Sequence, residues 1–130
     1  MKDLSSIRCL SIRQPWAWLI VAGHKTVENR SWRTSYRGPV LIQAGKQVDQ
    51  VDLHWLRESG VTLACDLPTG GIVGMTELVD VVEASSSLWF YGPFGYVLRD
   101  ARLLPFVPER GQLGFFRPSP AALAAVAASL

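Results

Sequence analysis

The chain has 130 residues, a formal net charge of +2 at pH 7, 48% hydrophobic residues and 18% charged residues. This composition is typical of a compact globular protein and excludes a largely disordered chain. The length suits one domain, and we expect a single domain over residues 1–130. No stretch reaches the ~18 consecutive apolar residues that a membrane-spanning helix needs, so no membrane partner is expected.

The mild positive charge permits an anionic partner without requiring one. The basic residues are dispersed, whereas strong duplex binders usually carry a Lys/Arg stripe, so a single nucleotide and an extended nucleic acid both stay open as ligands. Residues 1–6 lack the apolar segment of a secretory signal. Cys9 and Cys65 match no metal-ligand spacing, and we expect reduced thiols, a cytoplasmic protein, and no metal or other cofactor.

The first half of the chain combines short strands with one apolar helix. Alternating apolar and polar residues predict a strand over residues 8–13. Pro15 suits the first turn of a helix, which we expect to end at Gly23. Similar patterns then predict strands over residues 26–31 and 39–44 and a helix over residues 48–58.

The second half is richer in β signal. Residues 70–83 form the longest run of strand-favouring residues, and an aromatic loop follows over residues 84–95. We then expect strands over residues 96–107 (broken by Asp100 and Pro105) and 112–116, and an Ala-rich helix over residues 118–130. Five to six strands with two to three flanking helices, and no repeated βαβ rhythm, predict an α+β fold with a mixed, barrel-like sheet.

Six polar side chains lie at the two ends of the first apolar helix. They are Arg13, Gln14, Lys25, Glu28, Asn29 and Arg30. Their clustering predicts a polar pocket attached to the core. Lys25 could simply be a helix-end cation paired with Glu28. In the functional alternative, Lys25 is a desolvated amine that transfers protons, and Glu28 activates a water molecule for attack on an amide carbonyl.

The remaining polar residues of this cluster also allow two interpretations. Arg13 and Arg30 are either surface or structural cations, or they bind a phosphate or a base edge through the planar guanidinium. The amides of Gln14 and Asn29 can pair with the edge of a cytosine, although Asn29 equally suits a satisfied position in the core.

Aromatic side chains are the candidates for stacking on a base. Trp18 is expected in the core, whereas Trp16 lies nearer the predicted pocket and fits either role. Loop aromatics have less structural reason to exist and can stack on a base; they are Trp32, Tyr36, Trp89 and Tyr91. Glu77 is expected to face solvent from an alternating strand, with an inward-facing carboxylate as the alternative.

Two motifs of the chain resemble the ASCH family, the activating-signal-cointegrator homology domain. They are Gln-Pro-Trp-Ala at residues 14–17 and Ala-Gly-His-Lys-Thr-Val-Glu-Asn-Arg at residues 22–30. The central Gly-x-Lys-x-x-Glu-x-Arg pattern falls on Gly23, Lys25, Glu28 and Arg30. Later segments follow the family order too: residues 70–74, Glu77, residues 95–98 and residues 111–114.

The resemblance implies a PUA-like β-barrel, in a single ASCH domain with its core at about residues 8–117. PUA-like domains bind RNA or modified bases, and some small ASCH proteins are amidohydrolases that remove the acyl group from N4-acetylcytidine and related nucleosides. The catalytic lysine of that branch maps onto Lys25. Its catalytic threonine lies three residues later, where this chain has Glu28.

We therefore expect hydrolysis of the N4-acyl amide of a modified cytidine, with Lys25 and Glu28 as catalytic residues. The expected substrate-binding residues are Arg13, Gln14, Trp16, Asn29, Arg30, Tyr36 and Glu77. The alternative is a non-catalytic RNA-binding module, with an RNA-cleaving version in which Lys25 and Tyr36 supply the base and acid. A third possibility is a regulatory scaffold that binds protein through exposed aromatics. The expected partner is thus a modified nucleoside or RNA.

Overall fold

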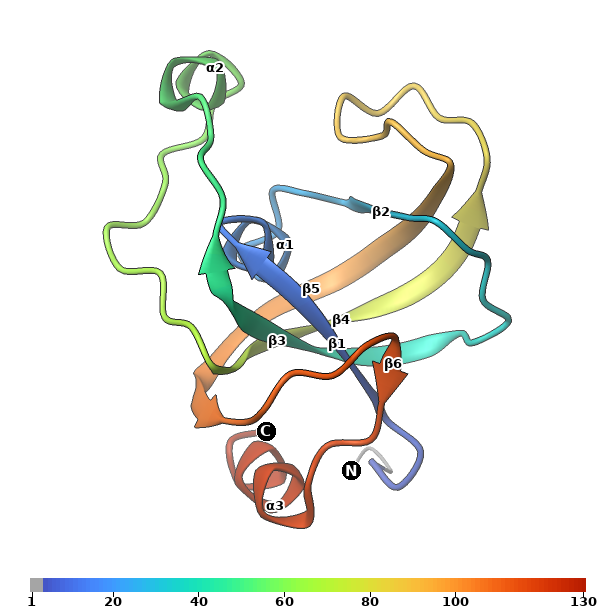
Figure 1. Ribbon diagram of the computed structural model, residues 1–130, viewed down its shortest axis with the longest axis vertical. Helices are drawn as coiled ribbons and strands as arrows, with labels where there is room; N and C mark the ends of the chain where they lie inside the picture. The colour runs from blue at the N-terminus through green and yellow to red at the C-terminus, as the bar shows by residue number, and fades with distance from the viewer. Residues whose placement is uncertain (1–3) are drawn as a thin grey trace.

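The computed structural model of the protein describes residues 4–130, which fold into one curled sheet and three helices (Figure 1). The strands are β1 (Arg8–Gln14), β2 (Val27–Arg30), β3 (Gly38–Val48), β4 (Gly71–Val82), β5 (Phe94–Pro108) and β6 (Phe115–Phe116). The helices are α1 (Trp16–Val21), α2 (Leu53–Glu58) and α3 (Pro120–Ala128). This confirms the predicted α+β class with a mixed, barrel-like sheet.

The strand order is β2-β5-β4-β3-β1-β6, and all neighbouring strands are antiparallel except β1 and β3. β1 and β3 run parallel, with Ile12 opposite Ala44. Parallel neighbours end at the same edge of a sheet. The residues that follow β3 therefore lie beside the end of β1, and Asp49 N–H donates to the Gln14 carbonyl at 2.7 Å.

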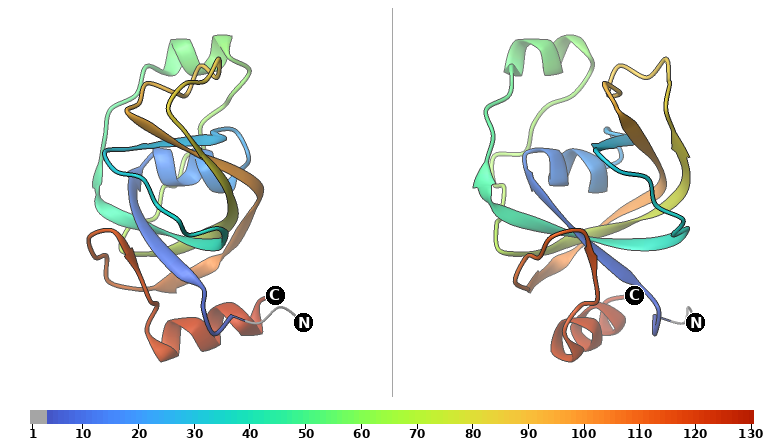
Figure 2. Two further views of the ribbon diagram at one scale, coloured as in Figure 1. Left: turned by 90° about the vertical axis from the view of Figure 1, so that its right-hand side faces the viewer. Right: turned by 45° about the vertical axis from the view of Figure 1, so that its right-hand side comes forward.

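The sheet carries a core on each face, because successive side chains of a strand point to opposite sides. α1 lies inside the curl and packs Ala17, Ile20 and Val21 against one face (Figure 2). α3 covers the other face, where Ala122 and Val126 pack against the second buried cluster. The concave side that holds α1 is also the side on which the candidate site forms.

Two glycines fix the position of α1. A Cβ atom at Gly74 would lie 2.6 Å from Val21 Cβ and 2.4 Å from the Arg102 carbonyl oxygen, so only glycine lets α1 approach β4 this closely. Gly23 has φ +89° and ends the helix as expected. The helix begins at Trp16, with Pro15 as its N-cap residue.

The prediction of a helix over residues 48–58 was wrong about where the helix starts. β3 continues to Val48, which pairs with Gln14, and α2 begins only at Leu53. The Asp52 side chain accepts hydrogen bonds from the N–H groups of His54 and Trp55, which sets the start of the helix.

Two predictions about the C-terminal strands also need correction. β5 runs unbroken through Asp100, which adopts φ +53°, and through Pro105. Because β2 pairs with β5 only over residues 94–97, the proline nitrogen needs no ladder partner on that side. β6 is shorter than residues 112–116, since Gln112 N–H donates to the Ser11 hydroxyl instead of joining a ladder.

Within the described residues, no helix is long and apolar enough to cross a membrane. Cys9 is buried, Cys65 is exposed, and neither forms a disulfide. The prediction about a secretory signal concerned residues 1–6, of which residues 1–3 lie outside the described part of the chain.

Candidate active site

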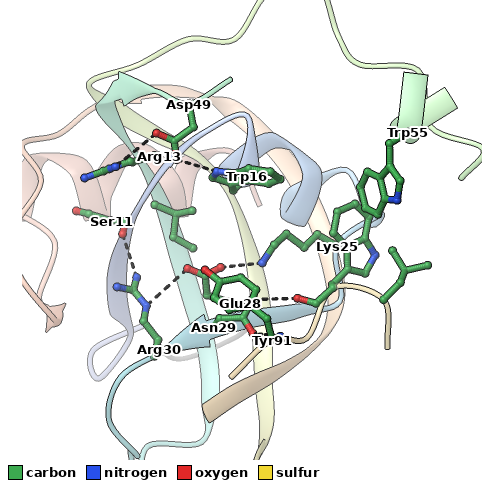
Figure 3. A pocket seen from close by; sticks show the side chains of 13 residues that line it. Ser11, Arg13, Trp16, Lys25, Glu28, Asn29, Arg30, Asp49, Trp55 and Tyr91 are labelled. Carbon is green, nitrogen blue, oxygen red and sulfur yellow. Dashed lines mark hydrogen bonds and ion pairs between the residues drawn. The ribbon is translucent and has the colours of Figure 1, made fainter. Parts of the chain in front are cut away.

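A cavity of about 500 Å³ opens on the concave side, between the end of β1, the strand β2 and two loops (Figure 3). Its volume lies in the range that accommodates small organic ligands. The lining residues are Ser11, Ile12, Arg13, Trp16, Lys25, Glu28, Asn29, Arg30, Asp49, Trp55, Leu88, Trp89 and Tyr91. Seven of the thirteen are polar or charged side chains other than tryptophan and tyrosine, so the site is built to orient a polar ligand.

An ion pair between Lys25 and Glu28 lies in the cavity wall. Lys25 Nζ donates to Glu28 Oε1 at 2.8 Å and to the Val27 carbonyl at 2.6 Å. The two side chains are only 6% and 14% exposed. An ammonium group carries three N–H donors, so one donor of Lys25 is left for a ligand.

The end of α1 positions this lysine. The N–H groups of His24 and Lys25 both donate to the Leu19 carbonyl, which folds the chain back immediately after the helix. β2 then begins at Val27 and pairs with β5, so Glu28 is held on a strand rather than on a loop. The pair therefore has a rigid frame.

Arg30 continues the same network. Its Nη2 donates to the Ser11 carbonyl at 3.1 Å, and its Nε lies 3.6 Å from Glu28 Oε2. Nε is buried and has no hydrogen-bond partner among residues 4–130. Figure 3 shows the resulting chain from Ser11 through Arg30 and Glu28 to Lys25, so the Glu28 carboxylate lies between two cations.

A second polar cluster lies at the cavity mouth. Trp16 Nε1 donates to Asp49 Oδ2 at 2.9 Å, which fixes the indole ring against the cavity. Arg13 Nη1 lies 3.4 Å from the other oxygen of the same carboxylate, and Arg13 is 59% exposed. Trp16 thus presents a fixed aromatic face beside a cation that solvent can reach.

The aromatic loop over residues 84–93 is attached to the site by Asn29. Its Nδ2 donates to the Trp89 carbonyl at 2.9 Å, and its Oδ1 accepts from the N–H groups of Tyr91 and Gly92 at 2.9 and 3.1 Å. All three bonds are to backbone. The amide that was expected to bind the substrate therefore lines the cavity while its own polar atoms hold the loop.

Large apolar side chains form the outer rim. Trp55 from α2 and Trp89 from the loop meet edge to face, with ring centroids 5.3 Å apart. Leu88 and Tyr91 are 63% and 85% exposed. Exposed aromatic side chains around a polar cavity are typical of a surface that receives a flat ligand.

Three of the predicted substrate-binding residues do not line this cavity. Gln14 is fully buried, with Nε2 donating to the Pro68 carbonyl and Oε1 accepting from Trp18 N–H. The Tyr36 hydroxyl donates to the Pro39 carbonyl, at the other end of the sheet, and burial raises the pKa of that phenol. Glu77 is half-buried on β4, opposite Pro39.

Sequence reasoning missed five lining residues: Ser11, Ile12, Asp49, Trp55 and Leu88. Asp49 follows a strand parallel to β1, and this parallel pairing, which brings it to Arg13, is not visible in the local pattern. Trp55 and Leu88 come from two segments that are distant in sequence. Trp55 belongs to the apolar pattern of the predicted helix, and no local signal in the sequence marks either residue as part of a site.

Among residues 4–130, no group of three or more His, Cys, Asp or Glu side chains is placed to hold a metal ion.

The curled mixed sheet with an internal helix, together with a polar cavity beside that helix, defines a small α+β ligand-binding module. The family model described as the ASCH domain matches residues 10–96. The chain belongs to the ASCH family, whose PUA-like fold is associated with RNA, and the resemblance drawn from the sequence motifs is confirmed.

Curated relatives include Activating signal cointegrator 1 of Mus musculus, 41% identical over 83 residues, and its Homo sapiens counterpart, 39% identical over 83 residues. Each match covers 58% of this chain and only 14% of the relative, so most of each relative has no counterpart here.

Among solved structures, ASCH from Zymomonas mobilis matches with a TM-score of 0.61 and 15% identity, over 94% of both chains. A single-substitution variant of that protein matches with a TM-score of 0.60, over 94% of this chain and 96% of the other. At this identity the likeness establishes the fold alone.

Proposed function

We propose that this ASCH domain, with its core at about residues 8–117, binds a modified cytidine in the 500 Å³ cavity and hydrolyses its N4-acyl amide. The observation that carries the proposal is the enclosed Lys25–Glu28 pair, 2.8 Å apart, in the wall of a cavity with a fixed indole at its mouth. A carboxylate and an amine held this way supply a base and an oxyanion-stabilising donor.

In the reaction, Glu28 accepts a proton from a water molecule while the oxygen of that water bonds to the acyl carbon. The free N–H donor of Lys25 stabilises the oxyanion of the tetrahedral intermediate. The bond from carbon to N4 then breaks, and N4 takes the proton from Glu28. One water is consumed, and the products are cytidine and a carboxylic acid, which releases its proton to solvent. This order of proton transfer is that of general base and then general acid catalysis by one group.

The remaining lining residues position the ligand in this proposal. Trp16 stacks on the cytosine ring, since a base stacked on an aromatic side chain gains ~1–3 kcal/mol. The Arg30 guanidinium, which lines the cavity and is 19% exposed, donates to a carbonyl oxygen of the ligand. Arg13, at the mouth, remains available for the sugar or its phosphate.

The test is turnover of N4-acetylcytidine by the purified chain, followed by separation of cytidine from substrate. Lys25→Met and Glu28→Gln are expected to lose turnover by ~10²-fold or more, in line with removal of a catalytic acid–base group. Glu83→Gln, which alters an exposed acid paired with Arg33, is the matched control and is expected to retain activity. Retention of activity in Lys25→Met would contradict the assignment.

A second candidate function, non-catalytic recognition of a base within RNA, is favoured by the exposed apolar rim of Trp55, Leu88 and Tyr91. In that case the folded protein binds a cytidine-containing RNA but releases no product. Binding without turnover would select this candidate over hydrolysis, with the same cavity as the binding site.

A further inference from the structure

A second cavity, of about 780 Å³, lies next to the candidate active site. Ser11 lines both cavities, so the two adjoin at this residue of β1. The other lining residues come from the end of β3, from the start of β4 and from the segment between β5 and β6. They are Gln43, Gly45, Lys46, Gly70, Pro108, Glu109, Arg110, Gly111, Gln112 and Leu113.

Two cations in this second cavity have no partner in the described part of the chain. Lys46 and Arg110 are exposed, and neither forms an ion pair or a side-chain hydrogen bond within residues 4–130. Glu109 is the one acid among the lining residues, and its carboxylate accepts from the N–H and hydroxyl of Ser119 at 2.6 and 3.1 Å. The Glu109 carboxylate keeps its negative charge but is held at the start of α3, and it forms no ion pair with Lys46 or Arg110 within the described residues.

The pairing of β1 with β3 places a third cation, Arg13, near Lys46. In the parallel pair of β1 and β3, the register moves from Ile12 opposite Ala44 to Gln14 opposite Val48. Arg13 therefore falls beside the irregular stretch that contains Lys46. Arg13 lines the first cavity and Lys46 the second. Arg13, which is paired with Asp49, and Lys46 thus lie at neighbouring positions of β1 and β3 on two adjoining cavities.

A buried acceptor supplies a further polar group. Gln43 is 1% exposed, its Nε2 donates to the Glu109 carbonyl at 2.9 Å, and its Oε1 has no hydrogen-bond partner among the described residues. A Cβ atom at Gly111 would lie 2.9 Å from this oxygen. Only a glycine therefore fits over this enclosed oxygen. Because a phosphodiester has no N–H or O–H group to donate, Gln43 is not a phosphate ligand, and the cations carry that role.

We propose that the second cavity binds the phosphodiester backbone next to the nucleotide whose base enters the first cavity, so that a single-stranded polynucleotide binds more tightly than a free nucleoside. This inference rests on one part of the proposed function, the binding of a base in the first cavity, and does not depend on hydrolysis. Unpaired cations beside a base-sized cavity favour a polyanion that carries bases, because phosphates neutralised by Lys and Arg release counterions and so strengthen binding.

The test compares two double variants with equal loss of charge. Lys46→Gln/Arg110→Gln removes both cations of the second cavity. Arg99→Gln/Arg102→Gln removes two exposed cations of β5 that line neither cavity. The probes are a fluorescein-labelled ten-nucleotide RNA with one N4-acetylcytidine, its DNA counterpart, and free N4-acetylcytidine. Affinities for the oligonucleotides are measured by anisotropy between 50 and 200 mM salt.

For a single strand, each phosphate contact contributes a slope of ~0.7 in log K against log salt. The cavity variant is therefore expected to lose about 1.4 from that slope and about 25-fold in affinity at 0.1 M salt. The β5 variant is expected to match the wild type, and neither variant is expected to change turnover of the free nucleoside. The RNA and DNA arms identify which sugar the cavity accepts.

Equal slopes for the two double variants, or no oligonucleotide binding by the wild type, would overturn the inference while leaving any nucleoside hydrolysis intact. Conversely, absence of turnover combined with a slope lost only in the cavity variant would overturn the hydrolysis proposal and support the backbone site. The two proposals therefore fail independently.

Discussion

Replacing Glu28 by glutamine tests whether the Lys25–Glu28 pair is the enclosed ion pair described above. Glutamine keeps the shape of the side chain and removes its charge, so the Lys25 ammonium is left without a counterion in a site where it is 6% exposed. Breaking a fully buried pair by removing one partner costs ~3–5 kcal/mol. Because Glu28 is 14% exposed and the amide oxygen still accepts a hydrogen bond, we expect a loss of ~2–4 kcal/mol in the free energy of unfolding.

The same substitution at Glu83 is the control. Glu83 pairs with Arg33 at 2.9 Å, but the two side chains are 65% and 54% exposed. Exposed pairs contribute ~0–1 kcal/mol, so Glu83→Gln should change stability little. Both variants are measured by urea unfolding at pH 7, with unchanged m-values as the check on two-state behaviour. A Glu28→Gln loss no larger than that of Glu83→Gln would refute the reasoning.

A double-mutant cycle sharpens the result. Lys25→Met/Glu28→Gln removes both charges, so it should be less destabilised than the sum of the two single variants by ~1–3 kcal/mol. Additive effects would show that the two groups do not interact as the 2.8 Å distance indicates.

Three further predictions follow from single contacts. Burial and the nearby Glu109 raise the pKa of the Cys9 thiol to about 12, so at pH 8 a thiol reagent should titrate Cys65 alone and reach Cys9 only after unfolding; two fast-reacting thiols in the native state would contradict this. Asn29→Ala removes three hydrogen bonds to the loop over residues 84–93, each worth ~1 kcal/mol. Hydrogen exchange at the Tyr91 and Gly92 amides should accelerate, and unchanged protection would show that the loop is held by other contacts. Trp16→Leu should weaken cytidine binding about tenfold if the indole stacks on the base, and unaltered affinity in a fluorescence titration would remove Trp16 from the ligand contacts.

Much of the fold was predictable because local patterns and tertiary structure agree along β1, α1 and β4. Gly23 ends α1 because the residue after the helix adopts a positive φ, which favours glycine, and a glycine at this position is visible in the sequence. The boundary between β3 and α2 was not predictable from periodicity. Apolar residues continue through it, and the strand pairing to Gln14 and the Asp52 cap decide where each element stops.

The candidate site also contains residues whose proximity was predictable from the sequence and residues for which it was not. Lys25, Glu28 and Arg30 share one short segment, so their proximity could be predicted from spacing. Asp49 reaches the site only through the parallel pairing of β1 and β3.

Side-chain direction explains the predicted site residues that lie elsewhere. Gln14 was grouped with the site because it precedes α1. Its amide is instead satisfied inside the core by Pro68 and Trp18, and one residue along a strand is enough to reverse a side chain.

The most direct test of the central claim is identification of the products formed from N4-acetylcytidine in ¹⁸O-labelled water. The account predicts cytidine without label and acetate with one ¹⁸O atom, since water attacks the acyl carbon beside Glu28. Formation of labelled uridine and acetamide would place the attack at the cytosine ring and contradict the mechanism. Recovery of unchanged substrate from folded protein would contradict the assignment of this cavity as a hydrolytic site.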